Sequence, residues 1–160
     1  MITDGVVSYV WALVQKKLDW SKVNGLDAIL PAQQQPELMN SNKPFMVFPS
    51  SAEYNNGELE PMDSEIISFV IFGSTVSDVN RAVDLMRNAF KATTSAENIN
   101  GWMRSPSNMP LAPAMGDLLV TYTQVMDAEA ANPAATEGSK YDGFVSVRVG
   151  YKTTPEDYSI

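Results

Sequence analysis

The chain has 160 residues, a length that fits one domain with a core that needs no disulfide or metal to hold it. It contains neither cysteine nor histidine, which excludes disulfides, thiolate metal sites, cysteine nucleophiles and every Ser–His catalytic triad. Eleven Lys and Arg residues oppose nineteen Asp and Glu residues, for a net charge of -8. Nucleic-acid backbones bind clustered cations, and this chain is acidic, so we expect the protein not to bind nucleic acid specifically.

The first segment predicts a helix over residues 3–18. Its apolar residues recur at helical spacing and would form one buried stripe: Ile2, Val6, Val10, Leu13 and Val14. Asp4 suits the positive amino end of the helix dipole, and Lys16 and Lys17 suit the carboxyl end. In a secretory signal positive charge precedes the apolar run, whereas here the negative Asp4 precedes it and Lys16 and Lys17 follow it. The apolar run is also shorter than the about 20 residues that span a bilayer. We therefore expect the protein to be assembled in the cytoplasm and to have no membrane anchor.

Residues 26–43 contain two prolines and three consecutive glutamines, which indicates an irregular arm or a short helical turn. Proline at both ends of 44–49 predicts a short strand near a sheet edge. An acidic, polar stretch over 50–64 follows, with Asn-Gly as its turn signal. Residues 66–72 carry bulky side chains on both faces, so we expect a central strand that is covered on both sides.

Residues 77–91 give the clearest helical pattern, with a stripe formed by Val79, Ala82, Val83, Met86 and Phe90. The next stretch, 93–116, is rich in Ser, Asn, Pro and Met and predicts a long loop. Residues 118–126 predict a strand, 127–142 a mobile hairpin tip, and 153–160 a polar tail.

The last strand, 144–152, alternates between two kinds of side chain. Val145, Val147, Val149 and Tyr151 would form the buried face, with Ser146, Arg148 and Lys152 on the wetter one. Together these elements predict a single α+β domain over 1–160. Its mixed or antiparallel sheet of about four strands would carry the N-terminal and central helices, with a core in 44–91 and 117–152.

Two places resemble ligand sites. The acidic residues Glu53, Glu58, Glu60, Asp63 and Glu65 crowd one segment, and several hard oxygens suit calcium. Their spacing lacks the alternation of an EF-hand loop, which favours a solvated acidic loop. The turn Gly73-Ser74-Thr75 precedes a helix, but no lysine follows it and Asp78 brings negative charge, which favours a capped turn over a phosphate cradle. We assign no catalytic residue, metal ligand or cofactor site.

The candidate interface residues are of three kinds. Arg148 and Lys152 form a basic stripe on the last strand of an acidic protein. Trp102 and Met109 lie in the Met-rich segment, where large adaptable side chains suit contact surfaces. Glu58 and Glu60 lie in an acidic segment outside the core pattern. For the stripe a solvent-facing role remains open, and for the methionines a core-filling one.

Two stretches resemble a known family. Residues 66–86, IISFVIFGSTVSDVNRAVDLM, are similar to the strand–turn–helix unit of tail terminator and tail-completion proteins of long-tailed bacteriophages, the lambda-like minor tail protein U group. Residues 144–151, FVSVRVGY, look like the last strand of those proteins. The resemblance implies a non-enzymatic virion protein, a homohexameric ring at the head-proximal end of the tail tube. Its partners would be the tube protein and the neck or connector, and DNA would pass through without specific binding.

Two other interpretations remain open on the sequence. A head–tail stopper or a tube subunit would share the same core. A ferredoxin-like ligand-binding domain or enzyme would use the acidic segment or the turn at Gly73, and it predicts a concave pocket with convergent polar groups.

Overall fold

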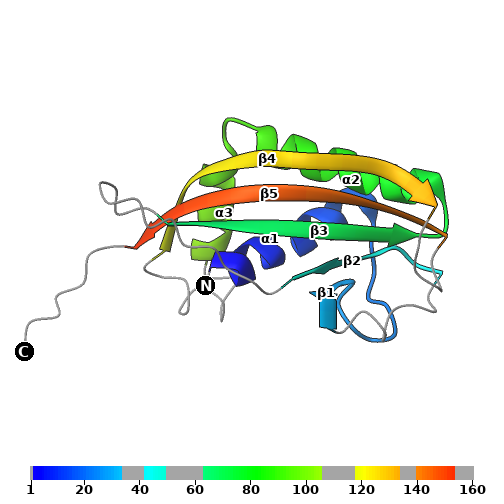
Figure 1. The fold of residues 1–160 in the computed structure, drawn as a ribbon. Helices are drawn as coiled ribbons and strands as arrows, with labels where there is room; N and C mark the ends of the chain where they lie inside the picture. Colours follow the sequence, from blue (N-terminus) through cyan, green and yellow to red (C-terminus); the bar gives the residue numbers. More distant parts are fainter. Residues whose placement is uncertain (1, 34–41, 50–62, 106–117, 134–139, 154–160) are drawn as a thin grey trace, which may run out of the picture.

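A computed structural model describes residues 2–33, 42–49, 63–105, 118–133 and 140–153. The elements in chain order are α1 (Ile2–Leu18), β1 (Ile29–Pro31), β2 (Phe45–Phe48), β3 (Asp63–Gly73), α2 (Val76–Lys91), α3 (Ser95–Arg104), β4 (Leu118–Pro133) and β5 (Tyr141–Thr153). The strands form one sheet in the order β1-β2-β3-β5-β4 (Figure 1). Only the β1–β2 pair is parallel. The α+β fold is therefore confirmed, with five strands in a mixed sheet.

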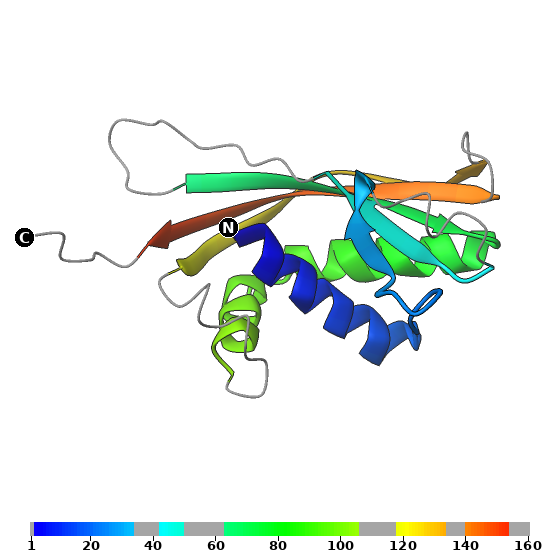
Figure 2. The ribbon, with the colours of Figure 1, turned by 90° about the horizontal axis from the view of Figure 1, so that it is seen from below.

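The three helices all lie on one face of the sheet (Figure 2). Successive strand residues point to opposite faces, so every second residue of β3 and β5 faces the helices. These residues are buried: Ile67, Phe69 and Ile71 on β3, and Val145, Val147, Val149 and Tyr151 on β5. The alternation predicted for the last strand is thus confirmed.

The central helix α2 forms where its stripe predicts it. The Thr75 hydroxyl accepts a hydrogen bond from the Asp78 backbone N–H at 3.1 Å and so caps the first turn. The predicted stripe residues of α2 are all buried against the sheet. In this segment the local helical pattern and the burial of its apolar side chains agree, which explains why the helix could be predicted from the sequence.

A buried carboxylate joins α1 to the centre of the sheet. Glu65 on β3 has no exposed surface, and it accepts hydrogen bonds from the Thr3 backbone N–H at 3.1 Å and from the Thr3 hydroxyl. The Tyr151 hydroxyl lies 3.5 Å from the other carboxylate oxygen. The first-turn N–H groups of a helix lack partners within the helix, and the helix dipole favours negative charge there. Glu65 therefore acts as an amino-terminal cap supplied from another element.

The segment 93–116 is not a loop throughout, because α3 occupies Ser95–Arg104. Its Ser, Asn and Gly residues are poor helix formers, so the helix could not be predicted from local propensity. Ile99 and Met103 are buried, and the Trp102 indole N–H donates to the Ser8 hydroxyl of α1 at 3.2 Å. Packing against α1 and β4 therefore stabilises a helix that local propensity does not favour.

The hairpin of β4 and β5 is longer than the sequence indicates. Residues 127–133 and 141–142 belong to these strands, where a loop tip was predicted over 127–142. Strand β4 also has a bulge between Val120 and Tyr122, which shifts the register. Thr123 and Val125 lie on the helix face together with Val120, while Tyr122 points to the other face. A bulge depends on pairing with β5, so alternation alone could not place it.

One expectation at the other edge needs correction. The predicted arm 26–43 is not irregular throughout, because it includes β1, which pairs with β2 in parallel. Strand β2 is therefore second from the edge, which agrees with its predicted place near a sheet edge. No described helix covers the second face of β3, for which the sequence predicts cover on both sides. The predicted strand 44–49, the central helix and the N-terminal helix agree with the structure within a few residues.

We expect Glu65→Gln to lower the free energy of unfolding by about 1–2 kcal/mol, because a neutral amide oxygen accepts the two Thr3 hydrogen bonds more weakly than a carboxylate and loses the attraction to the helix dipole. Urea denaturation followed by circular dichroism measures the change. Asp84→Asn, on the exposed side of α2, is the matched control and should change stability by less than about 0.5 kcal/mol. Equal effects of the two variants would contradict the capping role.

We expect Val83→Asp to destabilise the domain by about 3–5 kcal/mol, because it buries an unpaired charge between α2 and the sheet. Asn88→Asp introduces the same charge on the exposed side of α2 and should leave the fold intact. Thermal melting monitored by circular dichroism compares the two. A Val83→Asp protein that melts like the wild type would show that this face of α2 is not packed.

Candidate interaction surface

The sheet face opposite the helices is the most distinctive surface of the molecule. We call it the open face, and its central residues on the three long strands are Ile66, Ser68 and Val70 of β3, Phe144, Ser146 and Arg148 of β5, and Tyr122 and Gln124 of β4. No described helix lies on it (Figure 2). The central apolar side chains named here are half-buried or exposed, whereas their neighbours on the helix face are buried. Toward β2 the same face is closed, because Phe72 and Phe45 stack there and are buried.

Arg148 lies near the middle of the open face. Its guanidinium donates to the Ser64 hydroxyl at 3.0 Å, and its strand neighbours in register are Ile66 and Gln124. The Ser68 and Ser146 hydroxyls lie 2.9 Å apart and bond across β3 and β5. One planar, fully charged group surrounded by apolar and uncharged polar side chains is a composition that interfaces favour.

Tyr122 covers Gly150 of β5. An added Cβ on Gly150 would lie 2.0 Å from the Tyr122 Cε1 atom, so the phenol ring packs directly against the glycine backbone. Tyr122 is still 38% exposed, and Met126 further along β4 is 45% exposed. Aromatic and methionine side chains on an exposed strand contribute large contact areas when a partner covers them.

The predicted interface residues are only partly brought together. Arg148 lies on the open face, and the alternation of β5 puts the exposed Lys152 on the same face, opposite Leu119. Trp102 lies elsewhere, packed between α3 and α1. Met109, Glu58 and Glu60 lie outside the described residues. Sequence reasoning missed Tyr122 and Met126, because their exposure depends on the register of β4.

The predicted ligand sites have structural roles where they are described. At the turn after β3, Thr75 caps α2, and the Ser74 hydroxyl donates to the Asn42 carbonyl at 3.2 Å. In the acidic group Glu65 is the buried cap of α1. No set of three acidic side chains that could hold a metal occurs among the described residues.

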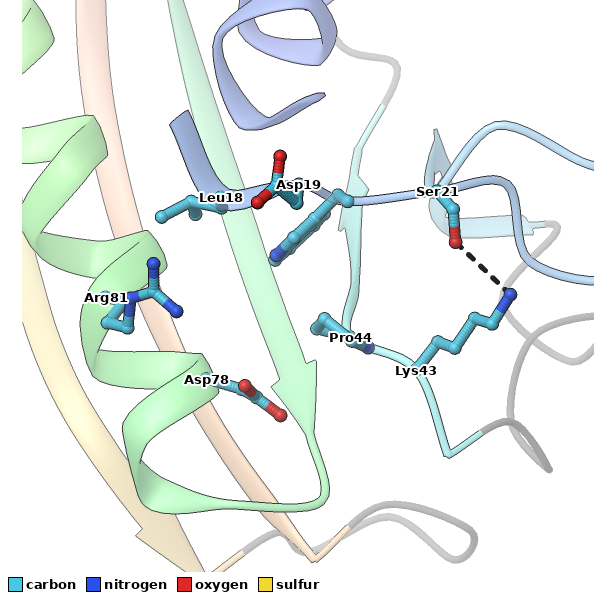
Figure 3. A pocket seen from close by; sticks show the side chains of 8 residues that line it. Leu18, Asp19, Ser21, Lys43, Pro44, Asp78 and Arg81 are labelled. Atoms are coloured by element: carbon cyan, nitrogen blue, oxygen red, sulfur yellow. Dashed lines mark hydrogen bonds between the residues drawn. The ribbon is translucent and has the colours of Figure 1, made fainter. Parts of the chain in front are cut away.

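A small cavity lies between the end of α1, the start of β2 and the first turn of α2 (Figure 3). Its volume is about 200 Å³, and its charged lining residues are Asp19, Lys43, Asp78 and Arg81. The Lys43 ammonium points to Ser21, whose hydroxyl lies 3.2 Å away. Sites for small molecules usually measure about 300–1,000 Å³, so this cavity is smaller than the pocket expected of a ligand-binding domain. Two of the charged lining side chains are acidic and two are basic, so the cavity does not favour a ligand of either charge.

Comparison with protein-family models and with curated protein sequences finds no match. Within the described part of the chain, no helix has the length and apolar character needed to cross a bilayer. The open face is the described surface from which we argue a function.

We expect Gly150→Ala to cost about 1 kcal/mol of stability, because the new methyl group must displace the Tyr122 ring. In a Tyr122→Ala background the same change should cost much less, since nothing remains to be displaced. A double-mutant cycle from thermal melts gives the coupling. Additive effects would contradict the close packing of ring and glycine.

Proposed function

We propose that this protein is a structural component of a bacteriophage virion, a tail terminator. Copies associate into a ring that caps the head-proximal end of the tail tube and docks it to the neck. The observation that carries the proposal is the open face, a half-covered sheet that presents tyrosine, methionine and arginine side chains to a partner.

The arrangement of the family-like segments supports this proposal. Residues 66–86 form β3, the turn and α2, and residues 144–151 form the middle of β5. Strands β3 and β5 are antiparallel neighbours at the centre of the sheet, and α2 packs on the same sheet, mainly against β4 and β5. The two segments that resemble tail terminators therefore constitute one continuous structural unit.

The chemistry of the chain also agrees with a role in assembly. It lacks the histidine and cysteine side chains on which many enzymes depend. Its net charge of -8 suits a ring through which DNA moves, because like charges repel and oppose binding. A head–tail stopper or a tube subunit is the alternative, since the same half-covered sheet would serve either of them.

Electron microscopy and native mass spectrometry of the purified protein test the proposal. We expect closed rings, homohexamers by the family resemblance, that stop the growth of tail tubes when added to polymerising tube protein. Open filaments would indicate a tube subunit, because a head-to-tail contact that does not close extends indefinitely. A monomer at every concentration would overturn the proposal.

We expect Arg148→Glu to weaken capping of tubes by about tenfold or more, because it reverses the central charge of the open face. The rings themselves should still form. Lys17→Glu makes the same charge change on the exposed surface of α1 and serves as the control. Capping that is equally strong in both variants would show that the open face is not the docking surface.

A further inference from the structure

The cavity of Figure 3 is lined by three parts of the chain that lie far apart in sequence. Asp19 and Trp20 follow α1, Lys43 precedes β2, and Asp78 and Arg81 lie in the first two turns of α2. The cavity volume of about 200 Å³ equals the share of about seven water molecules in the liquid. It therefore has room for a small organic molecule, although it is too small for a larger one.

Trp20 places an unpartnered hydrogen-bond donor in the wall of this cavity. The residue belongs to the core and is only 8% exposed, yet no described group accepts a hydrogen bond from its indole N–H. Among the described side chains, the one polar atom that is both sealed from solvent and unpartnered is the Thr121 hydroxyl oxygen, so the Trp20 nitrogen reaches open space. A buried indole N–H usually finds a partner, because an unmade hydrogen bond leaves the cost of desolvation uncompensated. An acceptor atom of a molecule in the cavity would supply that partner.

Arg81 and Asp78 carry opposite charges one helical turn apart, but they do not pair with each other. Residues three apart in a helix are neighbours, with Cβ atoms about 5–6 Å apart. Between described residues, the one ion pair within 4.0 Å joins Lys22 to Asp27. Both side chains project from α2 toward the cavity, and neither has a described hydrogen-bond partner (Figure 3). The guanidinium and the carboxylate are therefore both available to a ligand that lies between them.

The other two charges of the cavity differ in their surroundings. The Lys43 ammonium points to the Ser21 hydroxyl, 3.2 Å away, and lies 3.4 Å from the Lys22 carbonyl oxygen. Asp19 follows the last residue of α1 at a φ of 55°, and its carboxylate has no described partner. The four charges cancel, with two carboxylates on one side of the balance and two cations on the other. A ligand with no net charge that carries both signs therefore matches this lining.

We propose that the cavity binds a small zwitterion, a free α-amino acid with a short side chain. The carboxylate of the ligand accepts hydrogen bonds from the Arg81 guanidinium and the Trp20 indole N–H, and its ammonium group donates to Asp78 and Asp19. The two charged groups of an α-amino acid are attached to one carbon atom, a separation that suits side chains one helical turn apart. The inference goes beyond the proposed function, because capping a tail tube requires no ligand.

Size and charge together restrict the ligand. Serine has about seven non-hydrogen atoms, which fills a volume of this size, whereas a large side chain does not fit. A ligand with only one of the two charges leaves either Arg81 or the two carboxylates without a partner in the filled cavity. Such a ligand should therefore be discriminated against.

Isothermal titration calorimetry of the full chain with L-serine tests the site. We expect saturable binding with one site per chain. Acetate and methylammonium each carry one of the two charges, so each should bind at least about tenfold more weakly than serine. Acetate that binds as strongly as serine would show a simple anion site and overturn the proposal. So would the absence of binding by glycine, alanine and serine at about 10 mM, where a site with a Kd near 1 mM is largely filled.

Variants of the lining side chains locate the binding. Arg81→Gln and Asp78→Asn should each weaken serine binding by about tenfold or more, because each removes one charged partner. Trp20→Phe keeps an aromatic ring but removes the N–H, and it should weaken binding by up to about tenfold. Arg87→Gln and Asp84→Asn make the same changes on α2 outside the cavity and should have no effect. Serine binding that persists unchanged in both Arg81→Gln and Asp78→Asn would place it elsewhere and overturn the assignment.

Native mass spectrometry of the same samples separates this inference from the proposed function. Rings that form from a protein that binds no amino acid would overturn the inference alone. Serine binding by a protein that never forms rings would overturn the proposed function alone.

Discussion

The buried carboxylate of Glu65 is the constraint on which the arrangement of layers depends. It connects the central strand to the first turn of α1, and α1 in turn packs against α3 and α2. No described lysine or arginine pairs with it, so backbone and hydroxyl donors alone satisfy its charge. Burying an acid is costly unless it is hydrogen-bonded, so the position of α1 is fixed by the geometry of this contact. Helices α2 and α3 contact the sheet directly, so the Glu65 contact adds α1 to the same layer.

Placing every described helix on one face has a consequence for the surface. The opposite face keeps strand side chains partly exposed, with Arg148 at its centre and Tyr122 packed on Gly150. This surface is of the kind that binds protein through side chains.

The sequence by itself determined the elements whose local pattern agrees with their tertiary surroundings. Helix α2, with its Thr75 cap and regular stripe, and the alternating strand β5 were both predictable for that reason. Only the tertiary structure decided α3, the long end of β4 and the role of Glu65, because their residues have weak local preferences and depend on distant partners. The open face was half predicted, since alternation assigned Arg148 and Lys152 to it. The bulge that turns Tyr122 toward that face arises from pairing between strands, which no local pattern encodes.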